Sequence, residues 1–199
     1  RDGIPHDGTL TKPPNFVTRE RVNAVPFQSD PLRSTAIDKA LVSRPMIESD
    51  LDDVLAIENV SFATPWSRQL FMDELSNKAA TVVVFIVAGK LVGYVCFWEV
   101  VDEGHLLNIA VHPDRRRDGL GRFIMDYVEK SCVQRGLQKI LLDVARRNTP
   151  ARNLYKKCGF QTIGFRKRYY AEAQDDALVM EKRLNEKLPD GTGNPHGED

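Results

Sequence analysis

The feature that most restricts the fold is an apolar strand followed at once by a glycine- and arginine-rich loop and an amphipathic helix. The segment Leu106–Val111 is almost wholly apolar, and Pro113 stops it. After a run of arginines come Gly119 and Gly121, and apolar side chains then recur at helical spacing, which predicts a helix over about Leu120–Arg135. A strand, a flexible loop and a helix start in this order form an anion-binding arrangement.

The loop carries the groups that a phosphate needs. Unpaired N–H groups meet at a helix start, and glycine permits positive φ and close approach. Arg116, Arg117 and Arg122 add charge that suits a pyrophosphate better than a single carboxylate. The alternatives are a solvated surface turn, or nucleic-acid binding through Arg115–Arg117. The strand before the loop and the helix after it favour the phosphate site. No Gly-Lys-Ser/Thr of a Walker loop follows, and the third glycine of a Rossmann fingerprint is missing.

The spacing Arg116-x-x-Gly119-x-Gly121 after a strand resembles the acetyl-CoA signature of the GNAT acetyltransferase superfamily. A wider set of motifs, in matching order between about Leu41 and Leu184, is similar to N-terminal acetyltransferases of the RimI type. These motifs are Thr64-Pro65-Trp66-Ser67, Asp102-Glu103, Asn108-Ile109-Ala110-Val111, Gly119-Leu120-Gly121-Arg122, Leu142-Asp143-Val144, Asn148, Leu154-Tyr155, Gly159-Phe160 and Arg168-Tyr169-Tyr170. That family acetylates the N-terminal alanine of a small-subunit ribosomal protein, with acetyl-CoA as co-substrate and no metal.

The pattern along the chain predicts one α+β domain. Strands are expected at Leu41–Met46, Thr81–Ala88, Leu91–Val101, Leu106–Val111, Gln138–Val144, Gln161–Tyr170 and Ala177–Leu184, with Asp175 and Asp176 in the last connection. Helices are expected to begin at Ser49, Thr64-Pro65, Leu120 and Thr149-Pro150. Continuous apolar strands need covered faces. We therefore expect a mixed, mostly antiparallel sheet of about six to seven strands flanked by about four helices, the GNAT fold that the resemblance implies.

The flanking segments and the composition set the remaining expectations. Residues 1–40 are predicted to be a disordered N-terminal extension, 41–184 the acetyltransferase domain and 185–199 a flexible C-terminal tail. The formal net charge is zero, so we expect no direct binding of nucleic acid or membrane. Without a long apolar run or a signal peptide, a soluble, cytoplasmic protein is expected. The three cysteines lie inside apolar segments and predict core positions in a reducing compartment, and no histidines or cysteines stand at zinc-ligand spacing. The oligomeric state stays open.

The resemblance also implies roles for single residues. Asp143 is the expected proton acceptor and Tyr155 the expected proton donor. The residues expected to bind acetyl-CoA are Ile109, Ala110 and Val111 through their backbone, Arg116, Arg117, Asp118, Gly119, Leu120, Gly121 and Arg122 at the pyrophosphate, and Asn148 at the pantetheine arm. Trp66 is either a core anchor or a wall of the peptide channel, and Glu103 is a candidate for attracting the substrate ammonium. Ala145 stands where the family usually has arginine.

Acetyl transfer from a thioester to an amine needs a neutral amine, support for the carbonyl oxygen and a proton for the leaving thiolate. Asp143 replaces the usual glutamate, which shortens the side chain by ~1.5 Å and breaks direct reach to the amine unless a water bridges. The alternative, given equal weight, is that Asp143 is not a base and simply binds Arg146, Arg147 or the incoming ammonium. Three alternative functions remain: acetylation of a lysine or small amine, a non-catalytic GNAT-shaped acetyl-CoA-binding module, and an RNA-binding domain.

Overall fold

The computed structural model describes residues 41–170 and 175–184 of the chain. The strands are β1 (Leu41–Pro45), β2 (Ala80–Val87), β3 (Lys90–Val100), β4 (Glu103–Val111), β5 (Lys139–Ala145), β6 (Gln161–Tyr170) and β7 (Asp175–Arg183). The α-helices are α2 (Leu51–Ser61), α3 (Arg68–Ser76), α4 (Leu120–Gln134) and α5 (Thr149–Lys157), with short 3-10 turns η1 (Glu48–Asp50) and η2 (Pro113–Arg115). The residues predicted to form the two tails, 1–40 and 185–199, lie outside the described part.

All seven strands join one sheet in the order β1-β2-β3-β4-β5-β7-β6. Every neighbouring pair is antiparallel except β4 and β5, which run parallel. This confirms the predicted mixed, mostly antiparallel sheet, and the described residues contain four α-helices, as expected.

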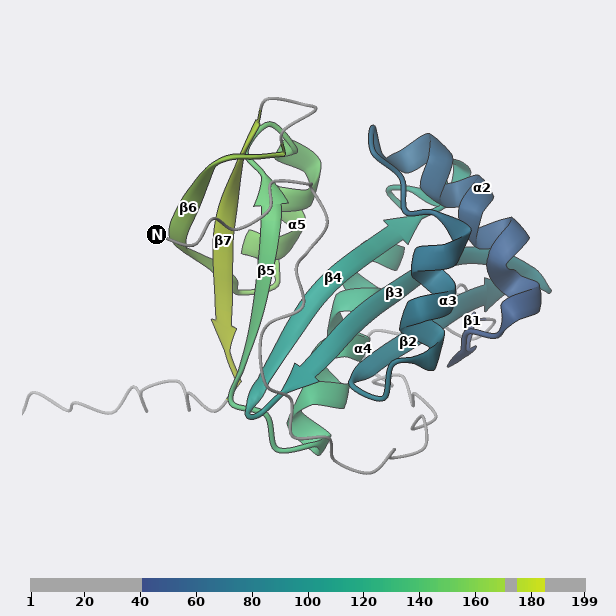
Figure 1. Ribbon diagram of the computed structural model, residues 1–199, viewed down its shortest axis with the longest axis horizontal. Helices are drawn as coiled ribbons and strands as arrows, with labels where there is room; N and C mark the ends of the chain where they lie inside the picture. Colours follow the sequence, from purple (N-terminus) through teal and green to yellow (C-terminus); the bar gives the residue numbers. More distant parts are fainter. Residues whose placement is uncertain (1–40, 171–174, 185–199) are drawn as a thin grey trace, which may run out of the picture.

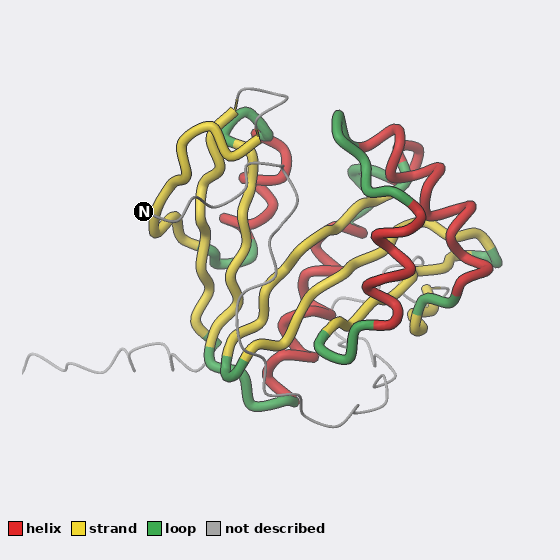
Figure 2. Tube along the Cα trace, viewed as in Figure 1, coloured by secondary structure: helices red, strands yellow, loops and turns green. Residues whose placement is uncertain are grey.

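Helices cover both faces of the sheet (Figure 1). On one face α2 and α3 pack on β2, β3 and β4 around a core that includes Leu51, Phe71 and Tyr94. On the other face α4 and α5 enclose a second core that includes Val128 and Tyr155. Figure 2 shows the helices standing on either side of the strand layer. This confirms the inference that the apolar strands are covered on both faces.

Three predicted helix starts and one loop were wrong in detail. The helix α3 begins at Arg68, where Ser67 accepts the Leu70 N–H, so Thr64-Pro65 precedes it. Asn148, rather than Thr149, caps α5 by accepting the Ala151 N–H. The N-cap residue of α2 is Asp50 rather than Ser49. The carboxylate of Asp50 pairs with Arg44. The predicted connection at Asp175 and Asp176 belongs to β7.

A β-bulge lies in β4. The register with β3 passes from Cys96↔Asn108 to Phe97↔Leu106, so Leu107 is an extra residue in β4. An inserted residue reverses the face that the following side chains point to. Accordingly Leu106 packs in the core beneath α4, whereas Asn108 points to α2.

The three cysteines Cys96, Cys132 and Cys158 are buried free thiols, which confirms their predicted core positions. Among the helices in the described residues, none has both the length and the apolar character to cross a membrane.

Candidate functional site

The two parallel strands at the centre of the sheet part from each other. β4 and β5 pair over four rows, from Glu103↔Lys139 to Leu106↔Leu142, and both strands then continue separately (Figure 1). We call the point beyond Leu106 and Leu142 the fork. Within the described part of the chain, no strand pairs with the β5-facing edge of β4 beyond the fork. Backbone groups on such an edge can hydrogen-bond an extended ligand, and Ile109, Ala110 and Val111 lie on it.

The predicted phosphate loop ends at the N-terminus of α4. Gly119 takes the N-cap position with φ +86°, and no side chain caps the helix there. The first bond of the helix is donated by Phe123 N–H to the Gly119 carbonyl, so the amides of Leu120, Gly121 and Arg122 precede the helical ladder. Amides at a helix start and the helix dipole attract anions in general, and the helix here has 15 residues.

The arginines of the loop point in different directions. Arg116 donates to the Val111 carbonyl at 3.2 Å and to Ser61 Oγ at 2.8 Å, so it ties the end of β4 to α2. Arg122 donates to Asp126 at 2.8 Å and to the Lys157 carbonyl at 2.6 Å. These two guanidinium groups are thus bound to the protein rather than aimed at the helix start. The side chain of Arg117 is exposed, while Asp118 accepts from Arg115.

The helix α5 lies against the start of α4. A methyl group at Gly121 would come 3.2 Å from the Leu154 side chain, and the Arg122–Lys157 bond joins the same two helices. Tyr155, the next residue after Leu154, is 6% exposed and its ring centroid is 5.9 Å from that of Phe160. The Tyr155 ring is therefore held in the core on the α4 and α5 side of the sheet, one residue along α5 from the side chain that meets Gly121. Asn148 lies at the start of the same helix with its oxygen engaged in capping.

Asp143 and Tyr155 lie on opposite faces of the sheet. Alternate residues of β5 are buried, and Leu142 and Val144 share the core of Tyr155. Asp143, the first residue of β5 beyond the paired rows, therefore points to the other face, where Arg166 Nε lies 3.4 Å from its Oδ1. Burial raises the pKa of Asp143, although Arg166 opposes this shift. The fork thus has the carboxylate of Asp143 on one face of the sheet and the core that contains Tyr155 on the other.

A buried carboxylate that the sequence reasoning missed connects these elements. Glu58 of α2 is 0% exposed and accepts from the Trp66 N–H at 2.8 Å, from Asn108 Nδ2 at 3.1 Å and from the Tyr94 hydroxyl. Trp66 itself is half-buried, with its ring centroid 5.2 Å from that of Phe71. The segment that carries Trp66 is thus fixed to β4 just beyond the fork, through one carboxylate. The available signal was a charge on the apolar stripe of a helix, at helical spacing from Leu51.

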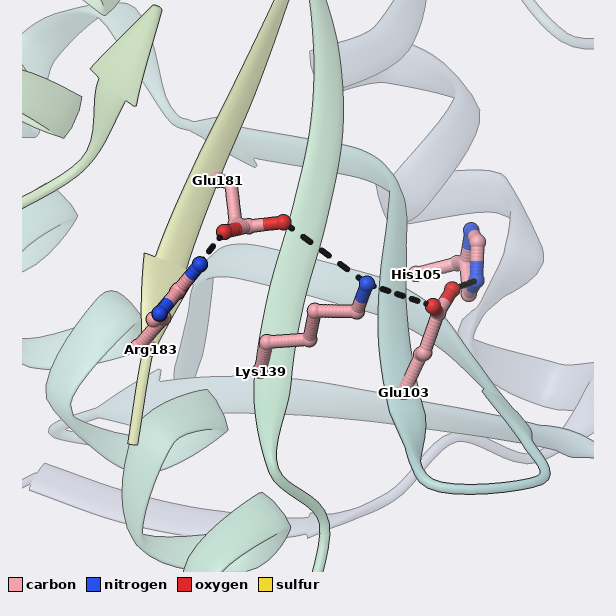
Figure 3. A network of polar contacts seen from close by, with 5 residues as sticks. All are labelled: Glu103, His105, Lys139, Glu181 and Arg183. Carbon is pink, nitrogen blue, oxygen red and sulfur yellow. Dashed lines mark hydrogen bonds and ion pairs between the residues drawn. The ribbon is translucent and has the colours of Figure 1, made fainter. Parts of the chain in front are cut away.

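Glu103 lies at the opposite end of β4 from the phosphate loop (Figure 1). Its two carboxylate oxygens lie 2.8 Å from Lys139 Nζ and 2.8 Å from His105 Nε2 (Figure 3). Across β5, the same network continues from Lys139 to Glu181 and Arg183. The carboxylate predicted to attract the substrate ammonium is therefore shared between two cationic or hydrogen-bonding groups of the protein itself. In residues 41–170 and 175–184, no cluster of three His, Cys, Asp or Glu side chains could hold a metal ion.

Comparison with known proteins agrees with this geometry. The family model described as acetyltransferase (GNAT) family matches residues 51–160. A Bacillus subtilis (strain 168) protein, provisionally named a ribosomal protein bS18-alanine N-acetyltransferase, is 38% identical over 149 residues, covering 74% of this chain and 98% of its own length. The Escherichia coli (strain K12) ribosomal protein bS18-alanine N-acetyltransferase is 33% identical over 136 residues, covering 66% of this chain and 90% of that protein. The crystal structure of the Escherichia coli ribosomal-protein-S18-alanine N-acetyltransferase superposes with a TM-score of 0.68 at 28% identity, covering 75% of this chain and 97% of that one.

Proposed function

Because this chain belongs to the acetyltransferase (GNAT) family and is an N-acetyltransferase, we propose that it moves the acetyl group of acetyl-CoA to the α-amine of a protein N-terminus, with alanine favoured as the first residue. The acceptor is a small-subunit ribosomal protein, as named for the relatives, or another cytoplasmic protein with a similar N-terminus. The observation that carries this proposal is the fork, which leaves a strand edge open between a carboxylate on one face and a phenol on the other.

The arrangement suits an extended cofactor with a charged end. Acetyl-CoA, when bound, supplies the thioester carbonyl that the amine attacks. Backbone groups of Ile109, Ala110 and Val111 would hold its acetyl and pantetheine portion, with Asn148 beside the arm. The amides at the start of α4, together with Arg117, would hold the pyrophosphate, which fits a helix N-terminus without a side-chain cap.

Direct transfer in a ternary complex divides the chemistry between the two faces. Asp143, on the acceptor face, attracts the amine. Tyr155, on the other face, gives a proton to the leaving thiolate, because a tyrosine hydroxyl can act as a general acid. An α-amine with a pKa near ~8 is roughly 10% neutral at pH 7, whereas a lysine with a pKa near ~10.4 is below ~0.1% neutral. An N-terminal acceptor therefore needs less help from a base.

The proposal is tested by mass spectrometry after incubation with acetyl-CoA and a peptide that begins with alanine and contains one lysine. We expect the acetyl group on the α-amine, with kcat reduced on the order of 10²-fold in Y155F. The matched control is Y127F, which removes a hydroxyl from another buried tyrosine, in the core beneath α4.

Acetylation of the lysine alone would replace the N-terminal acceptor with a lysine acceptor. Binding of acetyl-CoA without any transfer would favour the non-catalytic module. Binding of RNA that weakens steeply with salt would favour the nucleic-acid alternative.

A further inference from the structure

The β-bulge in β4 turns one polar side chain toward the acceptor face. Leu106 points into the core beneath α4, so in a regular strand Asn108, two residues further on, would point there too. The extra residue Leu107 instead directs Asn108 to the face on which Glu58 of α2 lies. Bulges beside active sites often redirect a side chain in this way. Asn108 therefore lies just beyond the fork, on the same face of the sheet as Asp143.

A buried carboxylate fixes the orientation of the Asn108 amide. Oε1 of Glu58 accepts the Trp66 N–H at 2.8 Å, so this oxygen acts as an acceptor, and the Asn108 atom that faces it at 3.1 Å is the donor Nδ2. The side-chain oxygen Oδ1 consequently points away from Glu58. In the described part of the chain, Oδ1 has no hydrogen-bond partner and is not closed off from solvent, although Asn108 as a whole is only 6% exposed.

This polar arrangement is not what packing alone would select. Glu58 is fully buried beneath α2, and a buried carboxylate is tolerated only when it is hydrogen-bonded. Apolar side chains of similar volume often give equal or greater stability at such positions. What the carboxylate does provide is an Asn108 amide held in one orientation with its oxygen open. Such a group is preorganised for a ligand that donates a hydrogen bond.

The acceptor amine is a ligand of that kind. An amine that attacks a carbonyl must direct its lone pair at the carbonyl carbon, so its N–H groups need acceptors on its other sides. Asp143 can accept one of them. A second carboxylate in this place would raise the pKa of the ammonium and keep its proton bound, whereas a neutral amide oxygen orients the amine without adding charge. An asparagine therefore suits this position better than an acid.

We propose that Asn108, oriented by Glu58, binds the acceptor amine by accepting one of its N–H groups at Oδ1, while Asp143 accepts another. This inference rests on the proposed function. With both hydrogen bonds made, the lone pair of the neutral amine is directed at the edge of β4, where the backbone of residues 109–111 would hold the acetyl group. Asn108 thereby selects an amine with two N–H groups over one that carries an alkyl group in place of a hydrogen.

The test uses two peptides that begin with alanine or with N-methylalanine and are otherwise identical. In wild type we expect kcat/KM for the methylated peptide to be lower on the order of 10-fold or more, because one N–H is lost. N108A and N108L both remove the acceptor, and N108L does so without opening space. Both should lower kcat/KM for the unmethylated peptide on the order of 10-fold and bring the two peptides within about threefold of each other. The KM for acetyl-CoA should stay unchanged.

The matched control is N77A. Asn77 at the end of α3 also donates to a buried carboxylate, that of Glu74 at 3.2 Å, but it is not part of β4. N77A should therefore lose stability while keeping the wild-type preference for the unmethylated peptide. A purely structural role of Asn108 would likewise leave that preference unchanged in N108A and N108L.

Wild-type preference retained in both variants would overturn the proposal. Equal use of the two peptides by wild type would overturn it without any variant. Failure of the proposed function is seen separately, because mass spectrometry of the wild-type product shows which amine is acetylated. If that amine is the side chain of a lysine, the same comparison proceeds with peptides that carry lysine or Nε-methyl-lysine.

Discussion

The side-chain amide of Asn108, just beyond the fork in β4, lies 3.1 Å from Oε1 of Glu58 in α2. The same oxygen accepts the Trp66 N–H. One buried carboxylate thereby joins the strand that is expected to hold the acetyl group to the segment that is expected to border the peptide channel. A substitution of Glu58 should therefore affect both β4 and the segment that carries Trp66.

Removing this carboxylate should destabilise the fold. In E58A the hydroxyl of Tyr94, the amide of Asn108 and the Trp66 N–H would lose their acceptor inside the core. Because each unsatisfied buried group costs about 1–3 kcal/mol, we expect the free energy of unfolding to fall on the order of 3 kcal/mol or more. Urea unfolding at pH 7 measures this. The control E48A, at an exposed glutamate, should change stability by less than about 0.5 kcal/mol, and a similar small change in E58A would contradict the prediction.

The pH dependence of stability should reveal the same group. Burial raises the pKa of Glu58, although hydrogen bonds from Trp66 and Asn108 oppose this. The folded protein therefore holds this proton more tightly than the unfolded chain. The stabilisation is present in full below the unfolded pKa and is lost as pH rises through the folded pKa. We expect the wild-type free energy of unfolding, relative to that of E58Q, to decrease as pH rises from about 4 toward neutrality. A difference that grows with pH would show that the pKa of Glu58 is lowered instead.

The left-handed backbone at Gly119 should matter for acetyl-CoA. Alanine at φ +86° is strained by roughly 1–2 kcal/mol, and relief of that strain would move the amides at the start of α4. We expect G119A to raise the KM for acetyl-CoA about fivefold or more, equivalent to about 1 kcal/mol of binding. Gly136, at the other end of α4, has φ +72° and equally open space around it. G136A should therefore lose similar stability with an unchanged KM, and equal effects of both variants on KM would argue against a phosphate site at Gly119.

Arg166 should control the protonation of Asp143. Burial raises the pKa of Asp143 and Arg166 lowers it, so R166Q leaves the effect of burial less opposed and the pKa should rise further. Because only the carboxylate attracts an ammonium, the KM for the peptide increases as pH falls through this pKa. We expect that increase to begin at higher pH in R166Q than in wild type, in steady-state kinetics between pH 5 and 8. R183Q removes another exposed arginine from the sheet and serves as control. An increase that begins at lower pH in R166Q would contradict the assignment.

Local patterns in the chain were enough to predict most helices and strands and the glycine loop that precedes α4. The helix predicted over Leu120–Arg135 runs over Leu120–Gln134, and the strand predicted at Leu41–Met46 runs over Leu41–Pro45. The helix start near Pro65 was predicted too early, and the helix near Pro150 was given the wrong cap residue. Both errors arise because several polar residues in a row can each cap a helix. Only the packing of the finished helix selects Ser67 and Asn148.

The sequence by itself determined that an apolar strand, a glycine loop and an amphipathic helix follow one another, because side-chain periodicity and backbone freedom are local properties. Only the tertiary structure decided which other strands and side chains this strand, loop and helix contact. The pairing of β4 with β5 ends after Leu106 and Leu142, and the bulge at Leu107 turns Asn108 toward Glu58. His105 and Asp143 share a face because of the register between two strands that are 38 residues apart in sequence, counted from His105 to Asp143. Such contacts depend on where two distant segments come into register, which no local pattern specifies.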